Sequence, residues 1–174
     1  MKDSPLLPID YWNELKARYG DKPCIYTTVE HGWAGNYFKQ YDDLEKFNKK
    51  NGTNIRWIYG AEAYWVKDRH ESDRSNCHII LLARTDKGRK AINKILSIAN
   101  KDGYYARPRI DLELIDQLPY DDVMITTACV AFWNKYDDIA DIVRHLAESF
   151  PHFYLEVQAH DTPAQKELNR RIIQ

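Results

Sequence analysis

Five residues of this 174-residue chain that can bind a metal ion stand in or beside apolar segments: Glu30, His31, Glu62, His78 and Cys129. Imidazole, carboxylate and thiolate groups are all ligands of zinc, and α/β barrel enzymes build their sites from the ends of several strands. His78, which opens the apolar run 79–83, is the most informative of the set. The pattern predicts a metal site shared by several strands.

Each of these residues also has an ordinary structural interpretation. His31 precedes Gly32 and could bond a backbone carbonyl, and His78 could be a buried histidine bonded to the backbone. Cys129 fits a small buried thiol that only packs. Glu62 in an apolar segment is costly unless it is paired or metal-bound, but it could point to solvent from an edge strand. Taken singly, the residues leave both interpretations open.

Other residues that could do chemistry have weaker contexts. His160, Asp161, Glu156, His70, His145 and His152 lie in polar or surface-like surroundings. The segment 101–109 combines aromatic and basic residues: Tyr104, Tyr105, Arg107 and Arg109. Such a set fits a surface that binds single-stranded nucleic acid, and it fits equally well a loop packed by its own tyrosines.

The elements that must position these residues follow from hydrophobic periodicity and turn residues. Helices are expected over 8–19, 37–50, 85–101, 110–118, 137–149 and from 163 onward, with strands over 23–29, 55–66, 78–83, 123–128 and 153–157. Asp10 is the expected N-cap of the first helix, and Gly20 its end. The alternation of strands and helices predicts an α/β fold with a largely parallel sheet.

One junction departs from this alternation. Between Tyr64 and His78 the chain is polar, with no helical pattern, and residues 67–76 read as a loop with nothing to bury. The two flanking strands are therefore expected to form an antiparallel hairpin. A hairpin sets the end of one strand beside the start of the next, so Glu62 should approach His78.

Composition limits the classes of protein. The formal net charge is −1, so no global field draws the chain to nucleic acid or membrane. The three cysteines are too few for a disulfide framework, and no segment has the pattern of a signal peptide or a membrane helix. With 44% hydrophobic residues, one domain with its own core and a cytoplasmic location are expected.

Six ordered blocks together resemble one family. They are residues 29–32, 58–62, 72–83, 103–111, 126–129 and 153–158. The chain, from about Ser4 to Gln174, resembles the polymerase and histidinol phosphatase (PHP) domain of bacterial and phage C-family DNA polymerase III alpha subunits. The resemblance implies a distorted TIM-like (β/α)7 barrel, here lacking its first and last strands. Residues 1–174 would then be a single, partial PHP domain.

The resemblance also implies a ligand set. Some members hold zinc or manganese at one end of the barrel, and the matching positions are His31, Glu62, His78 and Cys129, with Glu30 where aspartate is usual. Departures accompany these matches. The family's opening His-x-His pair would precede the chain and its closing Asp-x-His pair would follow it. Pro8 stands where an aspartate is expected, with Asp10 as the nearest substitute. The expected metal site is therefore incomplete.

As a function, the resemblance implies the N-terminal part of a DNA-directed DNA polymerase, a nucleotidyltransferase of DNA replication. The domain would act as a scaffold or as a dock for the proofreading exonuclease. Its partners would be DNA, through the wider polymerase, the exonuclease subunit and other replisome proteins, with no membrane. Two alternatives stay open: a stand-alone metal-dependent phosphoesterase or 3′–5′ exonuclease of the same superfamily, and a metal-free interaction module.

Overall fold

The computed structural model describes residues 6–74, 77–133 and 135–174, which form two compact units. The first unit contains the chain up to Thr28 together with Gly35–Tyr59, and the second contains Val29–Ala34 and Gly60–Gln174. The elements are α1 (Pro8–Tyr19), β1 (Cys24–His31), α2 (Tyr37–Asn51), β2 (Ile55–Trp65), β3 (Cys77–Ala83), α3 (Asp86–Lys101), β4 (Tyr104–Tyr105), β5 (Arg107–Ile110), α4 (Leu112–Ile115), β6 (Val123–Thr126), the 3-10 turn η1 (Val130–Phe132), α5 (Ile139–Ser149), β7 (Phe153–Tyr154) and α6 (Pro163–Ile173).

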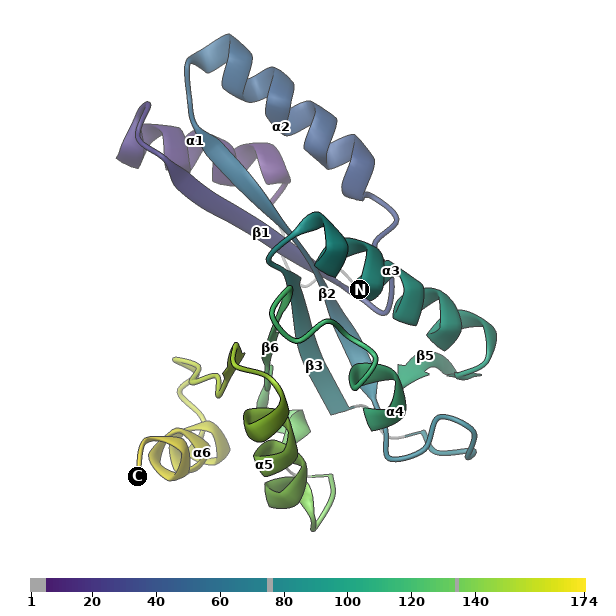
Figure 1. Ribbon diagram of the computed structural model, residues 1–174. Helices are drawn as coiled ribbons and strands as arrows, with labels where there is room; N and C mark the ends of the chain where they lie inside the picture. The colour runs from purple at the N-terminus through teal and green to yellow at the C-terminus, as the bar shows by residue number, and fades with distance from the viewer. Residues whose placement is uncertain (1–5, 75–76, 134) are drawn as a thin grey trace. The chain divides into compact units, whose positions relative to one another are not determined.

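The first unit is an α/β layer in which α1 and α2 pack on the first halves of β1 and β2 (Figure 1). Its core is largely aromatic and consists of Trp12, Tyr26, Leu44, Phe47 and Ile55. The indole of Trp12 meets the ring of Tyr26 edge to face, with 6.0 Å between ring centroids. Such pairs stabilise a core beyond the area that they bury.

Helix ends agree with the sequence signals, with one correction. Gly20 and Gly52 follow α1 and α2 with positive φ, as expected of helix C-caps. Asp10 is not the N-cap of α1. Leu7 holds that position, and Asp10 lies three residues inside, where its carboxylate accepts the Leu7 N–H at 2.8 Å. Because Pro8 occupies the first helical position, the N-cap is the residue before it, Leu7. Within the described residues, no helix is long and apolar enough to cross a membrane.

The sheet has the order β4-β5-β2-β3-β6-β7, with β1 also paired to β2. The predicted hairpin is confirmed: β2 and β3 are antiparallel and place Tyr64 opposite His78. β3 and β6 are also antiparallel, whereas β2 with β5 and β6 with β7 are parallel. The predicted α/β class is confirmed, and the sheet mixes both strand directions. The sevenfold count of the barrel stays a prediction.

The two faces of the β2–β3 hairpin differ in burial. Ala61, Ala63 and Trp65 on β2 are buried, as are Cys77, Ile79 and Leu81 on β3. Glu62 and His78, which alternate with them, are partly buried, and Tyr64 on the same face is buried. Since side chains alternate across a strand, the apolar core lies on one face and the candidate ligands lie on the other.

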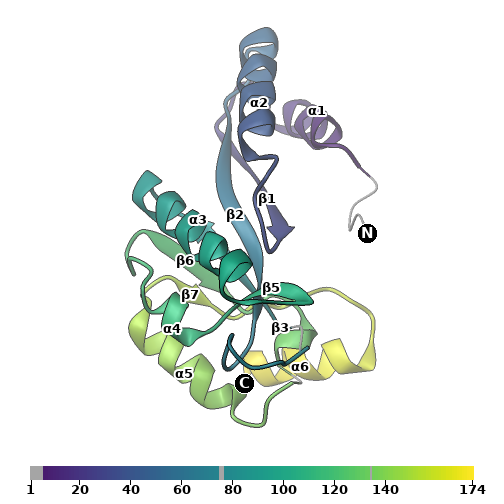
Figure 2. The ribbon, with the colours of Figure 1, turned by 90° about the vertical axis from the view of Figure 1, so that its right-hand side faces the viewer.

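Helices of the second unit cover the sheet at several places. α3 packs against β3 and β5 (Figure 1). α5 contacts β7 (Figure 2), and α6 contacts the 3-10 turn η1 that follows Cys129. Thr162 caps α6 through a hydrogen bond from the Gln165 N–H to its hydroxyl, as the Thr-Pro sequence predicts.

Four segments differ from the sequence prediction. β1 continues through Glu30 and His31, which were expected to begin a loop. The predicted loop 101–109 contains the antiparallel hairpin of β4 and β5, because Pro108 is tolerated in a short strand next to a turn. The last strand is only Phe153–Tyr154, and the predicted helix 110–118 is reduced to α4.

The β2–β3 loop was expected to bury nothing, and this expectation is wrong for its described residues. Arg69 is 8% exposed and donates from Nη1 to both carboxylate oxygens of Asp111, at 2.7 and 2.8 Å. Arg109, 3% exposed, donates to the backbone carbonyls of Arg69, Glu71 and Asp73. The side chains buried beneath this loop are therefore those of two arginines and not of apolar residues. Positions 75 and 76 of the predicted loop lie outside the described residues.

Replacing Asp111 by alanine should destabilise the second unit by about 3 kcal/mol, because it removes the buried carboxylate that pairs with the buried Arg69 and leaves the exposed Glu113 as its ion partner. The change in free energy of unfolding can be measured by urea denaturation. Asp141→Ala removes an exposed carboxylate that pairs with Arg144, and it should cost roughly 0.5 kcal/mol or less. Equal effects of the two substitutions would contradict the structural role given to Asp111.

Candidate metal centre

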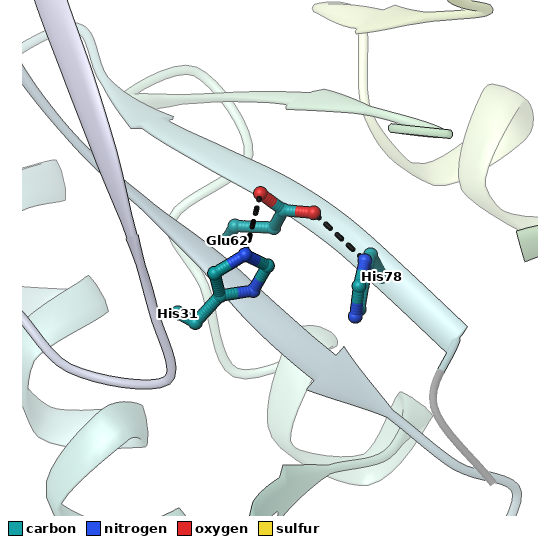
Figure 3. Close-up of side chains that lie close together, drawn as sticks. All are labelled: His31, Glu62 and His78. Atoms are coloured by element: carbon teal, nitrogen blue, oxygen red, sulfur yellow. Dashed lines mark ion pairs between the residues drawn. The ribbon is translucent and has the colours of Figure 1, made fainter. Parts of the chain in front are cut away.

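Glu62 is the centre of a cluster formed by three strands (Figure 3). One carboxylate oxygen lies 2.8 Å from Nδ1 of His78, and the other lies 3.7 Å from Nε2 of His31. The ligand atoms of these three side chains all lie within 4.8 Å of one another. The side chains of His31, Glu62 and His78 are 31%, 17% and 18% exposed, so an ion or water can reach them.

Strand pairing explains this convergence. In the β2–β3 register, Glu62 lies opposite Ile80 and Tyr64 opposite His78, so Glu62 and His78 are diagonal neighbours on one face. His31 ends β1, and the next residue, Gly32, donates its N–H to the Glu62 carbonyl at 2.8 Å. This hydrogen bond fixes the last residue of β1 beside Glu62.

Gly32 is required for this arrangement. Its φ is 70°, a left-handed conformation that favours glycine. A Cβ atom here would meet Pro108 Cγ at 2.6 Å and the Tyr64 ring at 3.2 Å. The left-handed turn after His31 therefore favours glycine, and close packing against β5 adds a second reason for it.

Cys129 joins the edge of the cluster. Its Sγ lies 3.7 Å from Nδ1 of His78 and accepts a hydrogen bond from the Ala131 N–H at the start of η1. The preceding residue, Ala128, is buried and has a φ of 51°, which is uncommon for a residue other than glycine. The structure holds a strained backbone at the position that directs this thiol, as functional sites often do.

The separations suit a metal ion. Ligands of one tetrahedral zinc lie roughly 3.3–3.6 Å apart, given bond lengths of about 2.0–2.3 Å. The distances Cys129 Sγ–His78 Nδ1 and His31 Nε2–Glu62 Oε2 are both 3.7 Å. Only the 2.8 Å contact between Glu62 and His78 is shorter, as expected of a hydrogen bond. His31, Glu62 and His78 could therefore hold one ion, and Cys129, which contacts the group only at His78, could join them by moving toward it.

The protonation of His78 is coupled to its neighbours in the cluster. Hydrogen bonds to Cys129 and to Glu62 raise the pKa of His78 to about 9. The same contact with His78 lowers the pKa of the Cys129 thiol from its usual value. Without a metal, His78 is therefore a cation near neutral pH. A metal ion must displace that proton, because only neutral imidazole coordinates.

Other residues predicted from the sequence do not join this group. Glu30 adjoins His31 on β1, and alternation directs adjacent side chains to opposite faces. Glu156 accepts hydrogen bonds from Thr126 and Gln158. His145 pairs with Asp116, and Asp161 with Lys166. Among the described residues, the converging set consists of His31, Glu62 and His78, with Cys129 beside His78.

Sequence reasoning missed the role of Tyr64. Its ring stacks on that of His31, at a centroid distance of 5.6 Å, and meets the His78 ring at 5.3 Å. Its hydroxyl accepts a hydrogen bond of 2.6 Å from Arg107. The available signal was the alternation that places Tyr64 on the same face as Glu62.

Comparison with known proteins identifies a family for this chain. The model of the PHP domain family matches residues 25–160, and the chain therefore belongs to that family. The DNA polymerase III subunit alpha of Aquifex aeolicus is 33% identical over 86% of this chain. Those of Borreliella burgdorferi and Deinococcus radiodurans are 28% and 25% identical over 83% and 91% of it. The chain spans 14%, 13% and 12% of the lengths of these three relatives.

The thiol of Cys129 should react faster with iodoacetamide than that of Cys77, since only the thiolate attacks. Cys77 is fully buried, and burial raises its pKa to about 12. For metal-free protein, the pH midpoint of Cys129 alkylation should lie below that of an ordinary thiol. His78→Gln should move this midpoint upward. Peptide mass spectrometry over a pH series measures both rates, and equal labelling of the two cysteines would contradict the assignment.

Proposed function

We propose that this chain is the PHP segment of a DNA polymerase III alpha-type subunit and serves DNA replication as a scaffold or as a dock for the proofreading exonuclease. The relatives, each named DNA polymerase III subunit alpha, support this proposal because they match nearly the whole chain. The near-neutral charge supports a protein-contacting role, since phosphate neutralisation dominates affinity for DNA. DNA would be contacted mainly through the wider polymerase.

Within that role, we propose a partial metal site in which one ion is held by His31, Glu62, His78 and Cys129. The observation that carries this proposal is the convergence of two imidazoles on one carboxylate, with a thiol 3.7 Å from His78. A thiolate ligand favours zinc over manganese, which prefers oxygen. When bound, zinc supplies a Lewis acid that activates water or polarises a phosphoryl oxygen.

Individual residues of the chain would have different roles around such an ion. Glu62 bridges the two histidines, so its carboxylate fixes both rings and supplies the negative charge of the site. Tyr64 packs against both rings and limits their rotation. Four ligands suffice for one tetrahedral ion, whereas in-line displacement at a phosphodiester often uses two ions. This count favours a scaffold with residual metal binding over a self-sufficient nuclease.

The purified chain, exchanged into metal-free buffer, should retain near-stoichiometric zinc or manganese when assayed by elemental mass spectrometry. His78→Ala should abolish the retained metal, because it removes the imidazole that contacts both Glu62 and Cys129. His145→Ala removes a half-exposed histidine paired with Asp116, and it should leave the metal content unchanged. Metal-free wild-type protein would favour the interaction module without metal.

A further inference from the structure

Arg107 of β5 is an exposed arginine whose side chain is held by one tyrosine. Its guanidinium donates a hydrogen bond of 2.6 Å to the Tyr64 hydroxyl, and its central carbon lies 4.8 Å from the centroid of the Tyr64 ring. Other exposed arginines pair with carboxylates, as Arg144 does within its own helix. Within the part of the chain that the structure describes, the hydrogen bond and the cation–π contact of the Arg107 side chain are both made with Tyr64.

Tyr64 connects Arg107 to the two histidines of the candidate metal centre. Its ring stacks on that of His31, with 19° between the two planes, and meets the ring of His78 edge to face. The rings of His31 and His78 also contact each other, at a centroid distance of 5.0 Å. The three rings form one packed group, so a rotation of Tyr64 would displace both imidazoles.

The β4–β5 hairpin places Arg107 beside this group. Tyr64 of β2 is paired with Arg109 of β5, and Arg107, two residues earlier, has its side chain on the same face of the sheet. Ala106, which joins β4 to β5, has a φ of 60°, in the left-handed region that residues other than glycine seldom adopt. Such conformations persist where the surrounding structure requires them, and they concentrate at functional sites.

We propose that Arg107 is a positioning residue of the candidate metal centre. Acting through Tyr64, it holds the two imidazole rings in the orientation in which they converge on the carboxylate of Glu62. This inference rests on the proposed function and adds to it a residue outside the ligand set. The hydrogen bond fixes the hydroxyl end of the tyrosine, and the cation–π contact fixes the plane of its ring. Ligands bind an ion tightly when the side chains behind them are themselves immobilised.

The charge of Arg107 gives this inference a testable sign. A guanidinium close to the centre repels a divalent cation, so its removal would tighten metal binding if charge alone mattered. A positioning role predicts the opposite result. Arg107→Met releases the Tyr64 ring, and both imidazoles then lose their fixed orientation. The direction of the change in metal affinity therefore separates the two effects.

The zinc affinity of the chain, measured by competition with a chromophoric chelator, tests this sign. Arg107→Met should weaken zinc binding by about tenfold, as loss of a residue that orients metal ligands does. Arg107→Lys should recover part of the affinity, because an ammonium can still donate to the Tyr64 hydroxyl but lacks the guanidinium plane. Circular dichroism verifies that each variant is folded.

Arg74→Met is the matched control for the loss of charge. Arg74 is also exposed and also lies over a tyrosine ring, that of Tyr105, at 5.7 Å from its centroid. That ring is not one of the three packed together at the centre, so the substitution should not weaken zinc binding. An equal loss of affinity in Arg74→Met and Arg107→Met would overturn the inference.

Tyr64→Phe tests whether Arg107 acts through the tyrosine. It removes the hydroxyl and keeps the ring against both histidines, so alone it should weaken zinc binding less than Arg107→Met does. Combined with Arg107→Met it should add no further loss, because the hydroxyl then has no guanidinium to fix it. Additive losses would mean that the two residues act independently, which contradicts the inference.

Proton–nitrogen NMR spectra of the histidine side chains measure the ring orientations without metal. In metal-free protein, Arg107→Met should shift the ring signals of His31 and His78, because both rings pack against Tyr64 and sense its ring current. The signals of His145, which pairs with Asp116, should not move. If the His31 and His78 signals also stay in place, the inference is wrong.

The outcomes distinguish this inference from the proposed function. If wild-type protein binds zinc and Arg107→Met binds it as tightly or more tightly, the metal site stands and the positioning role is rejected. If wild-type protein binds no zinc, the proposed metal site fails, and the metal-free histidine signals decide the inference by themselves. Shifted signals for His31 and His78 then support the positioning of the rings by Arg107.

Discussion

The antiparallel register between β2 and β3 is the constraint on which the site depends. It sets Tyr64 opposite His78, and alternation then puts Glu62 on the same face as both. A shift of one residue would exchange Glu62 for Ala61 or Ala63 and bury a carboxylate in the apolar core. The core residues of the opposite face therefore enforce the register, and the register forms the cluster.

Buried and accessible polar groups lie close together near the loop end of this hairpin. At the loop end, Arg69 and Arg109 fill the interior with charge-assisted hydrogen bonds to Asp111 and to backbone carbonyls. Slightly further along the strands, Glu62 and His78 interact in a partly exposed position, where solvent can reach the imidazole that binds the proton. The buried arginines hold the loop in place, while the cluster keeps polar groups available for a ligand.

Much of this arrangement could be predicted from the sequence, and the failures have physical causes. The missing helical pattern between Tyr64 and His78 predicted the hairpin, and the hairpin predicted the approach of Glu62 to His78, which the 2.8 Å contact confirms. Long-range polar pairs could not be predicted. The bond between Arg69 and Asp111 joins residues 42 positions apart and leaves no periodic signal. Arg107 and Arg109 look alike in sequence, and only the fold separates a buried structural arginine from an exposed one.

The central claim is that His31, Glu62, His78 and Cys129 together form one metal-binding site. The most direct test is anomalous X-ray diffraction at the zinc edge, on crystals of the chain grown with stoichiometric zinc. The account predicts one strong anomalous peak bonded to Nε2 of His31, a carboxylate oxygen of Glu62, Nδ1 of His78 and Sγ of Cys129. No peak there, or zinc bound only by surface histidines such as His145, would contradict it.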